Sequence, residues 1–262
     1  MTSPEPRDAF KEGSDYVQSL DRALTVILAF NQRGAMSQSE LAEITGLSRA
    51  VVRRMLLTLK YLGYVSQSGR QFSLTPRILD LGFSYLSSLS VTEFALPIME
   101  DVVRKTGESC SMSVLDGHEI VYVQRVAAKK IMAVTLGVGA RLPAFCASMG
   151  RVLLGGLGEQ ELDSWLDDLT PQQLTGRTLT DRTLLRQEIM KVGAQGFAYV
   201  EQELELGLCS VAVPVRDRTR RVCAALNIGM PYSEGARTRA VKELVPVLRE
   251  AATQIDRSLL TR

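Results

Sequence analysis

The spacing of apolar residues in the first eighty positions predicts three helices. One early apolar face recurs at helical intervals and consists of Leu20, Leu24, Ile27 and Leu28. Residues 37–40 (SQSE) have the form of a capping box, so Ser37 opens a short helix that Gly46 ends. Ser48 then caps a third helix, whose apolar stripe continues until Gly63 ends it.

A β-hairpin is predicted directly after these helices. Two short runs rich in β-forming residues, 64–67 and 71–74, flank the turn Ser68-Gly69-Arg70. Helix, short turn with glycine, helix and hairpin, in this order, predict a winged helix-turn-helix over residues 16–76. The polar residues 1–15 before it are predicted to form a disordered tail.

The remaining residues predict a linker helix, 77–91, and a second domain, 92–262. From Ser109 the pattern changes from helical to alternating, and helices then interrupt the strands. The expected strands are 109–115, 119–126, 130–136, 198–201, 210–215 and 222–228, and the expected helices are 93–105, 146–157, 159–168 and 181–194. A final amphipathic helix contains Pro246, which should bend or split it. Strands joined by hairpin turns and interrupted by helices favour an antiparallel α+β domain.

Basic residues are concentrated in the predicted helix-turn-helix. The whole chain has a formal net charge of only +2, but residues 49–77 carry six Lys or Arg and no Asp or Glu. A solvated basic face is the simpler interpretation of such a block. The block coincides, however, with the helix and hairpin that would contact double-stranded DNA, so we expect DNA binding. The residues expected to bind it are Ser37, Ser48, Arg49, Ala50, Arg53, Arg54, Lys60 and Arg70.

Composition and motifs argue against catalysis, metal binding and a membrane location. Of 262 residues 45% are hydrophobic, enough for a full core, yet no apolar run could span a bilayer. The sequence has no P-loop, H-E-x-x-H, G-x-S-x-G or C-x-x-C pattern, and its single histidine, His118, lies in a predicted turn. Four cysteines without close pairing indicate reduced thiols in the cytoplasm. We therefore expect no catalytic residue, no metal and no cofactor.

Three segments together with the helix-turn-helix resemble the IclR family of bacterial transcription regulators. They are residues 16–24 (YVQSLDRAL), 142–154 (LPAFCASMGRVLL) and 203–215 (ELELGLCSVAVPV). The resemblance extends from about Asp15 to the carboxyl terminus. Within the family the segments look most like the Pca and Pob type, the branch that regulates aromatic-acid breakdown through the β-ketoadipate pathway.

This resemblance implies a GAF-like effector domain, a homodimer or homotetramer, and a palindromic operator. The effector would be a small carboxylate such as protocatechuate, 4-hydroxybenzoate or β-ketoadipate, and RNA polymerase is a possible further partner. The matching motifs place the effector pocket at Ile131, Val134, Ser148, Met149, Ser210, Asn227 and Gly229. Some relatives carry serines at 227 and 229, a cysteine at 210 and an acid at Val200, so a glyoxylate- or pyruvate-type ligand is disfavoured.

The residues of the same region are compatible with an anionic ligand. Ser148, Met149 and Gly150 open a predicted helix, whose free backbone amides suit an anion. A planar guanidinium matches a carboxylate with two hydrogen bonds, and the candidates are Arg125, Arg141 and Arg151. A surface salt bridge explains each arginine singly, but we expect one of the three to face the cavity.

Two alternatives to a ligand-responsive regulator remain open from the sequence. The first is a small-molecule enzyme or thiol-based sensor that uses Cys146 in the same pocket, since a low-pKa cysteine is a nucleophile. The second is a regulator whose pocket no longer binds a ligand. A Cys146–His118 dyad is disfavoured, because an exposed turn is the simpler place for this histidine.

Overall fold

The computed structural model of the chain describes residues 11, 15–88, 90–128 and 137–260. Nearly all of the predicted tail and the whole of the predicted strand 130–136 lie outside the described residues. The chain divides into two units, of which the first ends at Tyr85 and the second begins at Leu86. The predicted domain limits at 76 and 92 stay predictions.

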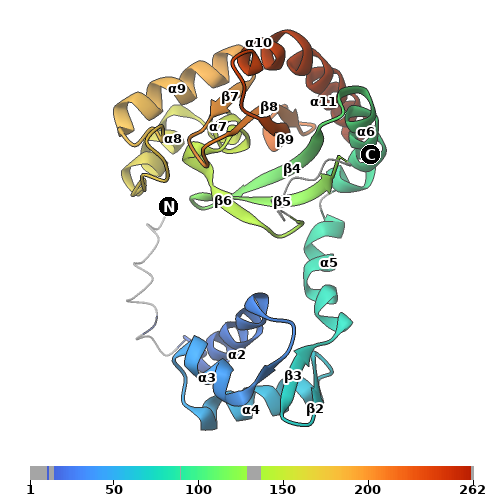
Figure 1. Cartoon of the computed structure of the whole chain (residues 1–262), viewed down its shortest axis with the longest axis vertical. Coiled ribbons are helices and arrows are strands. Elements are labelled where there is room, and N and C mark those ends of the chain that lie inside the picture. Colours follow the sequence, from blue (N-terminus) through green and yellow to red (C-terminus); the bar gives the residue numbers. More distant parts are fainter. Residues whose placement is uncertain (1–10, 12–14, 89, 129–136, 261–262) are drawn as a thin grey trace. The chain divides into compact units, whose positions relative to one another are not determined.

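The first unit has the predicted order of helix, helix, helix and hairpin (Figure 1). Its elements are α2 (Gln18–Ala29), η1 (Phe30–Gln32), β1 (Met36–Ser37), α3 (Gln38–Thr45), α4 (Arg49–Tyr61), β2 (Val65–Ser68), β3 (Gln71–Leu74) and η2 (Pro76–Ile78). The three strands form an antiparallel sheet in the order β1-β3-β2. One apolar core joins helices and hairpin and includes Val26, Leu41, Val52, Leu56 and Phe72. The winged helix-turn-helix predicted from the sequence is therefore confirmed.

Helix ends in this unit follow the sequence signals. The Ser37 hydroxyl accepts a hydrogen bond from the Glu40 amide at 3.3 Å, and the Glu40 carboxylate accepts one from the Ser37 amide at 2.8 Å. Gly46 and Gly63 follow α3 and α4 with φ angles of 67° and 83°, a region that favours glycine. These local signals fix where each helix starts and ends.

The second unit is an α+β domain built on one antiparallel sheet. Its elements are α6 (Ser90–Thr106), β4 (Ser109–Asp116), β5 (Glu119–Val126), β6 (Arg141–Pro143), η3 (Ala144–Cys146), α7 (Ser148–Leu154), α8 (Glu159–Asp167), α9 (Arg182–Gln195), β7 (Ala198–Glu201), β8 (Leu208–Arg216), β9 (Val222–Pro231), α10 (Ala236–Arg239) and α11 (Val245–Leu260). The strand order is β6-β5-β4-β9-β8-β7. The remaining helix, α5 (Leu79–Ser88), contains the boundary between the two units. The expected GAF-like antiparallel sheet is confirmed.

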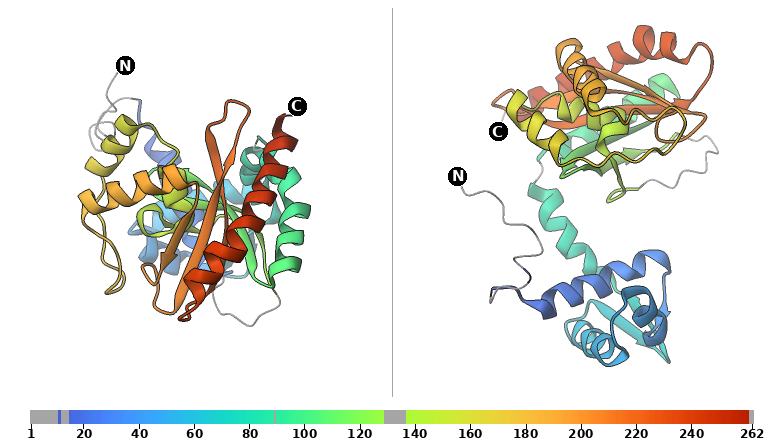
Figure 2. Two further views of the ribbon diagram at one scale, coloured as in Figure 1. Left: turned by 90° about the horizontal axis from the view of Figure 1, so that it is seen from above. Right: turned by 90° about the vertical axis from the view of Figure 1, so that its left-hand side faces the viewer.

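The two faces of this sheet are covered by different helices. Residues such as Cys110, Met112 and Val211 pack with α6 and α11 in one core. Their strand neighbours point the other way, so that Tyr122, Ala212 and others pack with α7, α8 and α9 in a second core. Figure 2 shows the sheet between these helix layers. The alternation gives α7 a place directly on one sheet face.

The last helical region is interrupted where the sequence predicts it. A π-helical turn, Ala240–Leu244, separates α10 from α11, and Pro246 is the second residue of α11. Proline has no amide hydrogen to donate to the preceding turn, so a regular α-helical ladder cannot pass through it. None of the described helices is long and apolar enough to cross a membrane.

The turn between β4 and β5 is attached to α8 through aromatic side chains. The Trp165 indole donates a hydrogen bond to the Gly117 carbonyl at 2.8 Å. The exposed His118 ring lies against it, with 4.9 Å between the ring centroids. His118 thus lies in a turn, as the sequence predicts, and contacts Trp165.

Candidate DNA-binding surface and effector pocket

One face of α4 carries the arginines expected to bind DNA. Val52, Leu56 and Leu59 are buried in the first unit, whereas the opposite face is exposed. The exposed residues are Arg49, Ala50, Arg53, Arg54 and Lys60. Within the described residues, none of these cations forms a salt bridge with a carboxylate. A helix that presents unpaired guanidinium groups to solvent is suited to the negative phosphates and base edges of DNA.

The start of α4 is held in place by two polar contacts. The Ser48 hydroxyl accepts a hydrogen bond from the Val51 amide at 3.4 Å, and the Gln38 side chain donates to the Arg49 carbonyl at 2.8 Å. Ser37 and Ser48 therefore serve as helix caps in the free protein, whichever further contact they make with DNA. The Gln38 bond links the start of α3 to the start of α4.

The hairpin supports the end of α4. The Lys60 ammonium donates a hydrogen bond to the Gln67 side chain at 3.0 Å, which links the helix to β2. Arg70 lies exposed in the turn between β2 and β3. The wing thus carries an exposed guanidinium at its tip, which has no partner among the described residues.

The second unit contains a cavity between the sheet and α7. Its volume is about 50 Å³, and the walls come from β5, β6, η3, α7, β7, the loop before β8, β8 and β9. The described lining residues are Tyr122, Leu142, Cys146, Ala147, Ser148, Met149, Val200, Gln202, Glu203, Leu204, Leu208, Cys209, Ser210 and Asn227. The set includes five residues expected from the sequence and family motifs: Cys146, Ser148, Met149, Ser210 and Asn227.

Neutral polar groups dominate the chemistry of this cavity. The Ser210 hydroxyl donates to the Ser148 hydroxyl at 2.8 Å, which joins β8 to the start of α7. Asn227 is 7% exposed, and its side-chain amide makes no hydrogen bond to the described residues. Burial raises the pKa of Tyr122 to about 12, so its hydroxyl stays a neutral donor. A ligand with a hydroxyl or carbonyl group finds hydrogen-bonding partners here.

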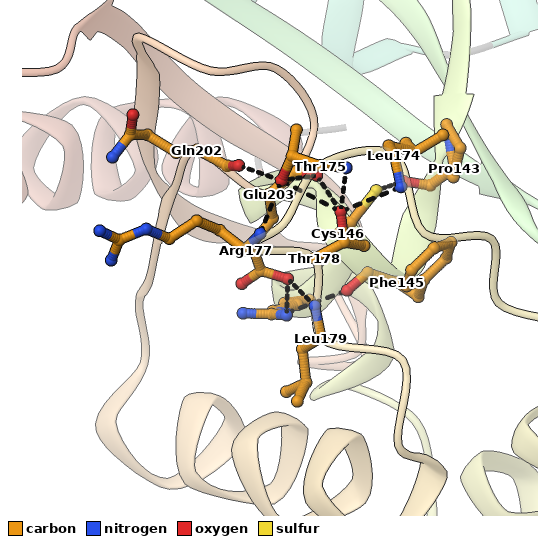
Figure 3. Close-up of polar contacts among 11 residues, drawn as sticks. Pro143, Phe145, Cys146, Leu174, Thr175, Arg177, Thr178, Leu179, Gln202 and Glu203 are labelled. Atoms are coloured by element: carbon orange, nitrogen blue, oxygen red, sulfur yellow. Dashed lines mark hydrogen bonds and ion pairs between the residues drawn. The ribbon is translucent and has the colours of Figure 1, made fainter.

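Glu203 is the charged residue in the described lining, and it is already paired. Its carboxylate lies 2.7 Å from the Arg151 guanidinium, with only 11% and 3% of the two side chains exposed. The same carboxylate accepts the Leu179 amide at 3.1 Å, and the Glu203 carbonyl accepts the Thr178 hydroxyl at 2.6 Å. Figure 3 shows Glu203 among the residues of these contacts. The loop before β8, α7 and the segment around Thr178 are thereby joined at one point.

The three candidate arginines have different surroundings. Arg141 is partly exposed and pairs with Asp116 and with Glu119, so it forms a surface salt bridge. Arg151 is buried and donates to the Phe145 carbonyl at 3.0 Å as well as to Glu203. Arg125 is half-buried and donates to the Ser111 hydroxyl at 3.4 Å. None of the three lies in the described cavity lining.

Two glycines expected in the pocket are also absent from its described lining. A Cβ atom on Gly150 would lie 2.0 Å from the Ala144 carbonyl oxygen, so this glycine lets α7 pack against η3. Gly229 pairs with Ser109 and Ser210 in the sheet, and a Cβ there would meet none of the described atoms within 4 Å. Ile131 and Val134 lie outside the described residues.

Cys146 lines the cavity but has the environment of an unreactive thiol. Burial raises its pKa to about 12, and the nearby Glu203 carboxylate adds to the rise. Because the thiolate is the nucleophile, a raised pKa disfavours covalent chemistry at neutral pH. The described residues contain no cluster of three or more His, Cys, Asp or Glu that could hold a metal ion.

Some pocket residues carried no sequence signal. Tyr122 and Gln202 line the cavity, yet nothing in their spacing distinguishes them from ordinary strand or loop residues. Their place in the lining follows from the folded sheet, in which β5 carries Tyr122 and Gln202 comes directly after β7.

Fold and site together define a DNA-binding module joined to a ligand-binding α+β domain, which is the arrangement of a bacterial one-chain transcription regulator. Residues 19–69 match the IclR helix-turn-helix domain, and residues 83–257 match the C-terminal domain of the bacterial transcriptional regulator IclR. The chain belongs to the IclR family of ligand-responsive transcription regulators.

Individual relatives cover nearly the whole chain. It is 38% identical over 262 residues to the Pca regulon regulatory protein of Pseudomonas putida, covering 99% of this chain and 90% of that one. A transcriptional regulator from Rhodococcus sp. RHA1 is 48% identical with a TM-score of 0.83, over 94% of this chain and 99% of that one. An IclR homologue from Microbacterium hydrocarbonoxydans, complexed with 4-hydroxybenzoate, is 26% identical with a TM-score of 0.83. The match covers 93% of this chain and 100% of that one.

We predict that breaking the Arg151–Glu203 pair lowers the free energy of unfolding by about 3–5 kcal/mol. Arg151→Met leaves the Glu203 carboxylate buried without its cation, and Glu203→Leu leaves the guanidinium alone. The double variant removes both charges and should lose less than either single one. Urea unfolding measures these free energies. The control is Arg186→Met, which removes the exposed ion pair with Asp163 and should lower the free energy of unfolding by about 0–1 kcal/mol. Equal losses at both pairs would contradict the assignment.

We predict slow alkylation of Cys146. Its raised pKa leaves almost no thiolate below pH 9, so iodoacetamide at pH 8 should modify it far more slowly in the folded protein than in 6 M urea. Peptide mass spectrometry separates its modification from that of Cys110, Cys209 and Cys223. Fast labelling of Cys146 in the folded protein would instead support a thiol-based sensor.

Proposed function

We propose that this regulator controls genes of aromatic-acid breakdown and that its effector is protocatechuate, 4-hydroxybenzoate or β-ketoadipate. Support comes from the name of the Pseudomonas putida relative and from the ligand of the Microbacterium homologue. The neutral polar groups of Tyr122, Ser210 and Asn227 suit the hydroxyl or keto group of such acids. Ser148 and Met149 at the start of α7 also line the cavity.

We propose that α4 reads the operator in the major groove while the wing contacts the backbone. The observation that carries this proposal is the row of exposed arginines on α4 without carboxylate partners among the described residues. Arginine matches guanine O6 and N7 with two hydrogen bonds, and Arg70 at the wing tip is placed to contact a neighbouring phosphate.

A palindromic operator and a homodimer or homotetramer belong to the same proposal. A single module offers few contacts, and paired modules would read two half-sites about one helical turn apart. The outer face of α2 supports pairing, because Val17, Leu20, Leu24 and Leu28 are 47–64% exposed. An apolar stripe of this kind on a small unit is typical of a surface that another protein covers.

The effector can change transcription only if it binds two states of the regulator unequally. The states must differ in affinity for DNA or in contact with RNA polymerase, the further partner that the proposal allows. No catalytic step is included, because the family and the protonated Cys146 both favour binding over chemistry.

We predict that Arg53→Ala and Arg54→Ala weaken operator binding. An arginine that reads a base should cost about 1–3 kcal/mol and relax sequence preference, whereas one on a phosphate should lower the salt slope by about one. Fluorescence anisotropy with the promoter region beside the gene, at several salt concentrations, measures both effects. Lys242→Ala in the second unit is the control and should change neither. Wild-type protein that ignores this DNA at low salt would refute the proposal.

We predict that an aromatic-pathway acid stabilises the protein against heat. A ligand present at 100 times its dissociation constant adds about 2.7 kcal/mol to the free energy of unfolding. Thermal shift with protocatechuate, 4-hydroxybenzoate, β-ketoadipate, glyoxylate and pyruvate tests this, and the last two should have no effect. If no acid raises the melting temperature, the pocket is vestigial and the effector proposal is wrong.

A further inference from the structure

A row of polar side chains crosses the sheet beside the effector cavity. Strand pairing places Ser111 of β4 between Arg125 of β5 and Asn227 of β9. Cys110 and Met112 on either side of Ser111 point into the core formed with α6 and α11. Ser111 therefore points to the other face, which is the face that carries the cavity.

Arg125 lies on this cavity face. Its guanidinium donates to the Ser111 hydroxyl at 3.4 Å, and Ser111 is only 2% exposed. A bulge after Met112 shifts the pairing by one residue, so that Tyr122 and Arg125 point to the same side of the sheet. The positive charge is close enough to Tyr122, a cavity residue, to oppose the rise that burial causes in the pKa of its hydroxyl.

The charge of Arg125 has no counter-charge in the described part of the chain. Arg141 pairs with Asp116 and Glu119, and Arg151 pairs with Glu203, but no salt bridge joins Arg125 to a described carboxylate. A half-buried guanidinium bound only to a neutral hydroxyl keeps most of its donors unused. Buried charges in proteins are normally paired, so this position is suited to an anion from outside the chain.

On the sheet face beside this row, the described residues leave open space at Gly229. Gly229 is two residues beyond Asn227 on β9 and points to the same face. No atom of the described residues would lie within 4 Å of a Cβ there. Ser210, the cross-strand neighbour of Gly229, already lines the cavity.

We infer that Arg125 binds the carboxylate of the effector, with Ser111 holding the guanidinium in position from β4. The inference rests on the proposed function and adds which group of the ligand binds at which residues. The described lining of the cavity supplies the neutral groups of Tyr122, Asn227 and Ser210, and its charged residue Glu203 is already paired with Arg151. The effector is thus an acid with one carboxylate at Arg125 and an uncharged hydroxyl that these neutral groups bind, which favours a hydroxybenzoate over a dicarboxylate.

Calorimetry with a charged ligand and its uncharged counterpart tests this assignment. The ligands are 4-hydroxybenzoate and 4-hydroxybenzamide, and the proteins are the full-length wild type, Arg125→Gln, Arg125→Lys and the control Arg141→Gln. Loss of a charge-assisted hydrogen bond should weaken binding of the acid to Arg125→Gln by about tenfold to a hundredfold. The amide should bind wild type and Arg125→Gln equally weakly. Arg125→Lys should retain part of the affinity, and Arg141→Gln all of it.

Two results would overturn the inference while leaving the proposed function intact. One is unchanged affinity of Arg125→Gln for 4-hydroxybenzoate. The other is an equal loss for acid and amide, which would mean that Arg125 only supports the fold. Tighter binding of β-ketoadipate than of 4-hydroxybenzoate would overturn the assigned polarity. If the wild type binds none of the acids, the proposed function itself fails.

Discussion

The buried contact between Arg151 and Glu203 fixes the walls of the cavity that we propose as the effector pocket. It joins the helix under the pocket, α7, to the loop that forms the opposite wall, and Glu203 also binds the segment around Leu179. Neither side chain can be buried on folding without the other, because burying an unpaired charge costs free energy. The Arg151 end is fixed in turn by the Phe145 carbonyl and by the close packing that Gly150 permits. The charges of Arg151 and Glu203 are therefore already paired before any ligand enters the cavity.

Arginines of this chain differ in their pairing, and we propose that they differ in function accordingly. Those of α4 are exposed and lack described carboxylate partners, so their charges are available to DNA. Arg141 and Arg151 have acids beside them and contribute to structure. Arg125 lies between these cases, half-buried and bound to a neutral serine. Net charge, at only +2, conceals this division completely.

The sequence predicted the parts of the fold that depend on neighbours along the chain. Capping at Ser37, the left-handed glycines after α3 and α4, and the interruption near Pro246 are local and were confirmed. The pocket depends on strand order and register, which local signals do not encode. Tyr122 and Gln202 were missed for that reason. Arg151 was grouped with the ligand candidates because its partner Glu203 is 52 residues away in the sequence. The family motifs identified Ser148, Met149 and Ser210 because each lies within a recognisable segment.

The attachment of Trp165 to the β4–β5 turn has a spectroscopic consequence. This is the single tryptophan of the chain, and it lies in the second unit, against His118 and the Gly117 carbonyl. Intrinsic emission excited at the red edge therefore comes from one position, beside the β4–β5 turn. Unfolding of the helix-turn-helix alone leaves that indole in its folded environment. Tryptophan fluorescence and helical circular dichroism will therefore show different unfolding transitions wherever the two units unfold separately.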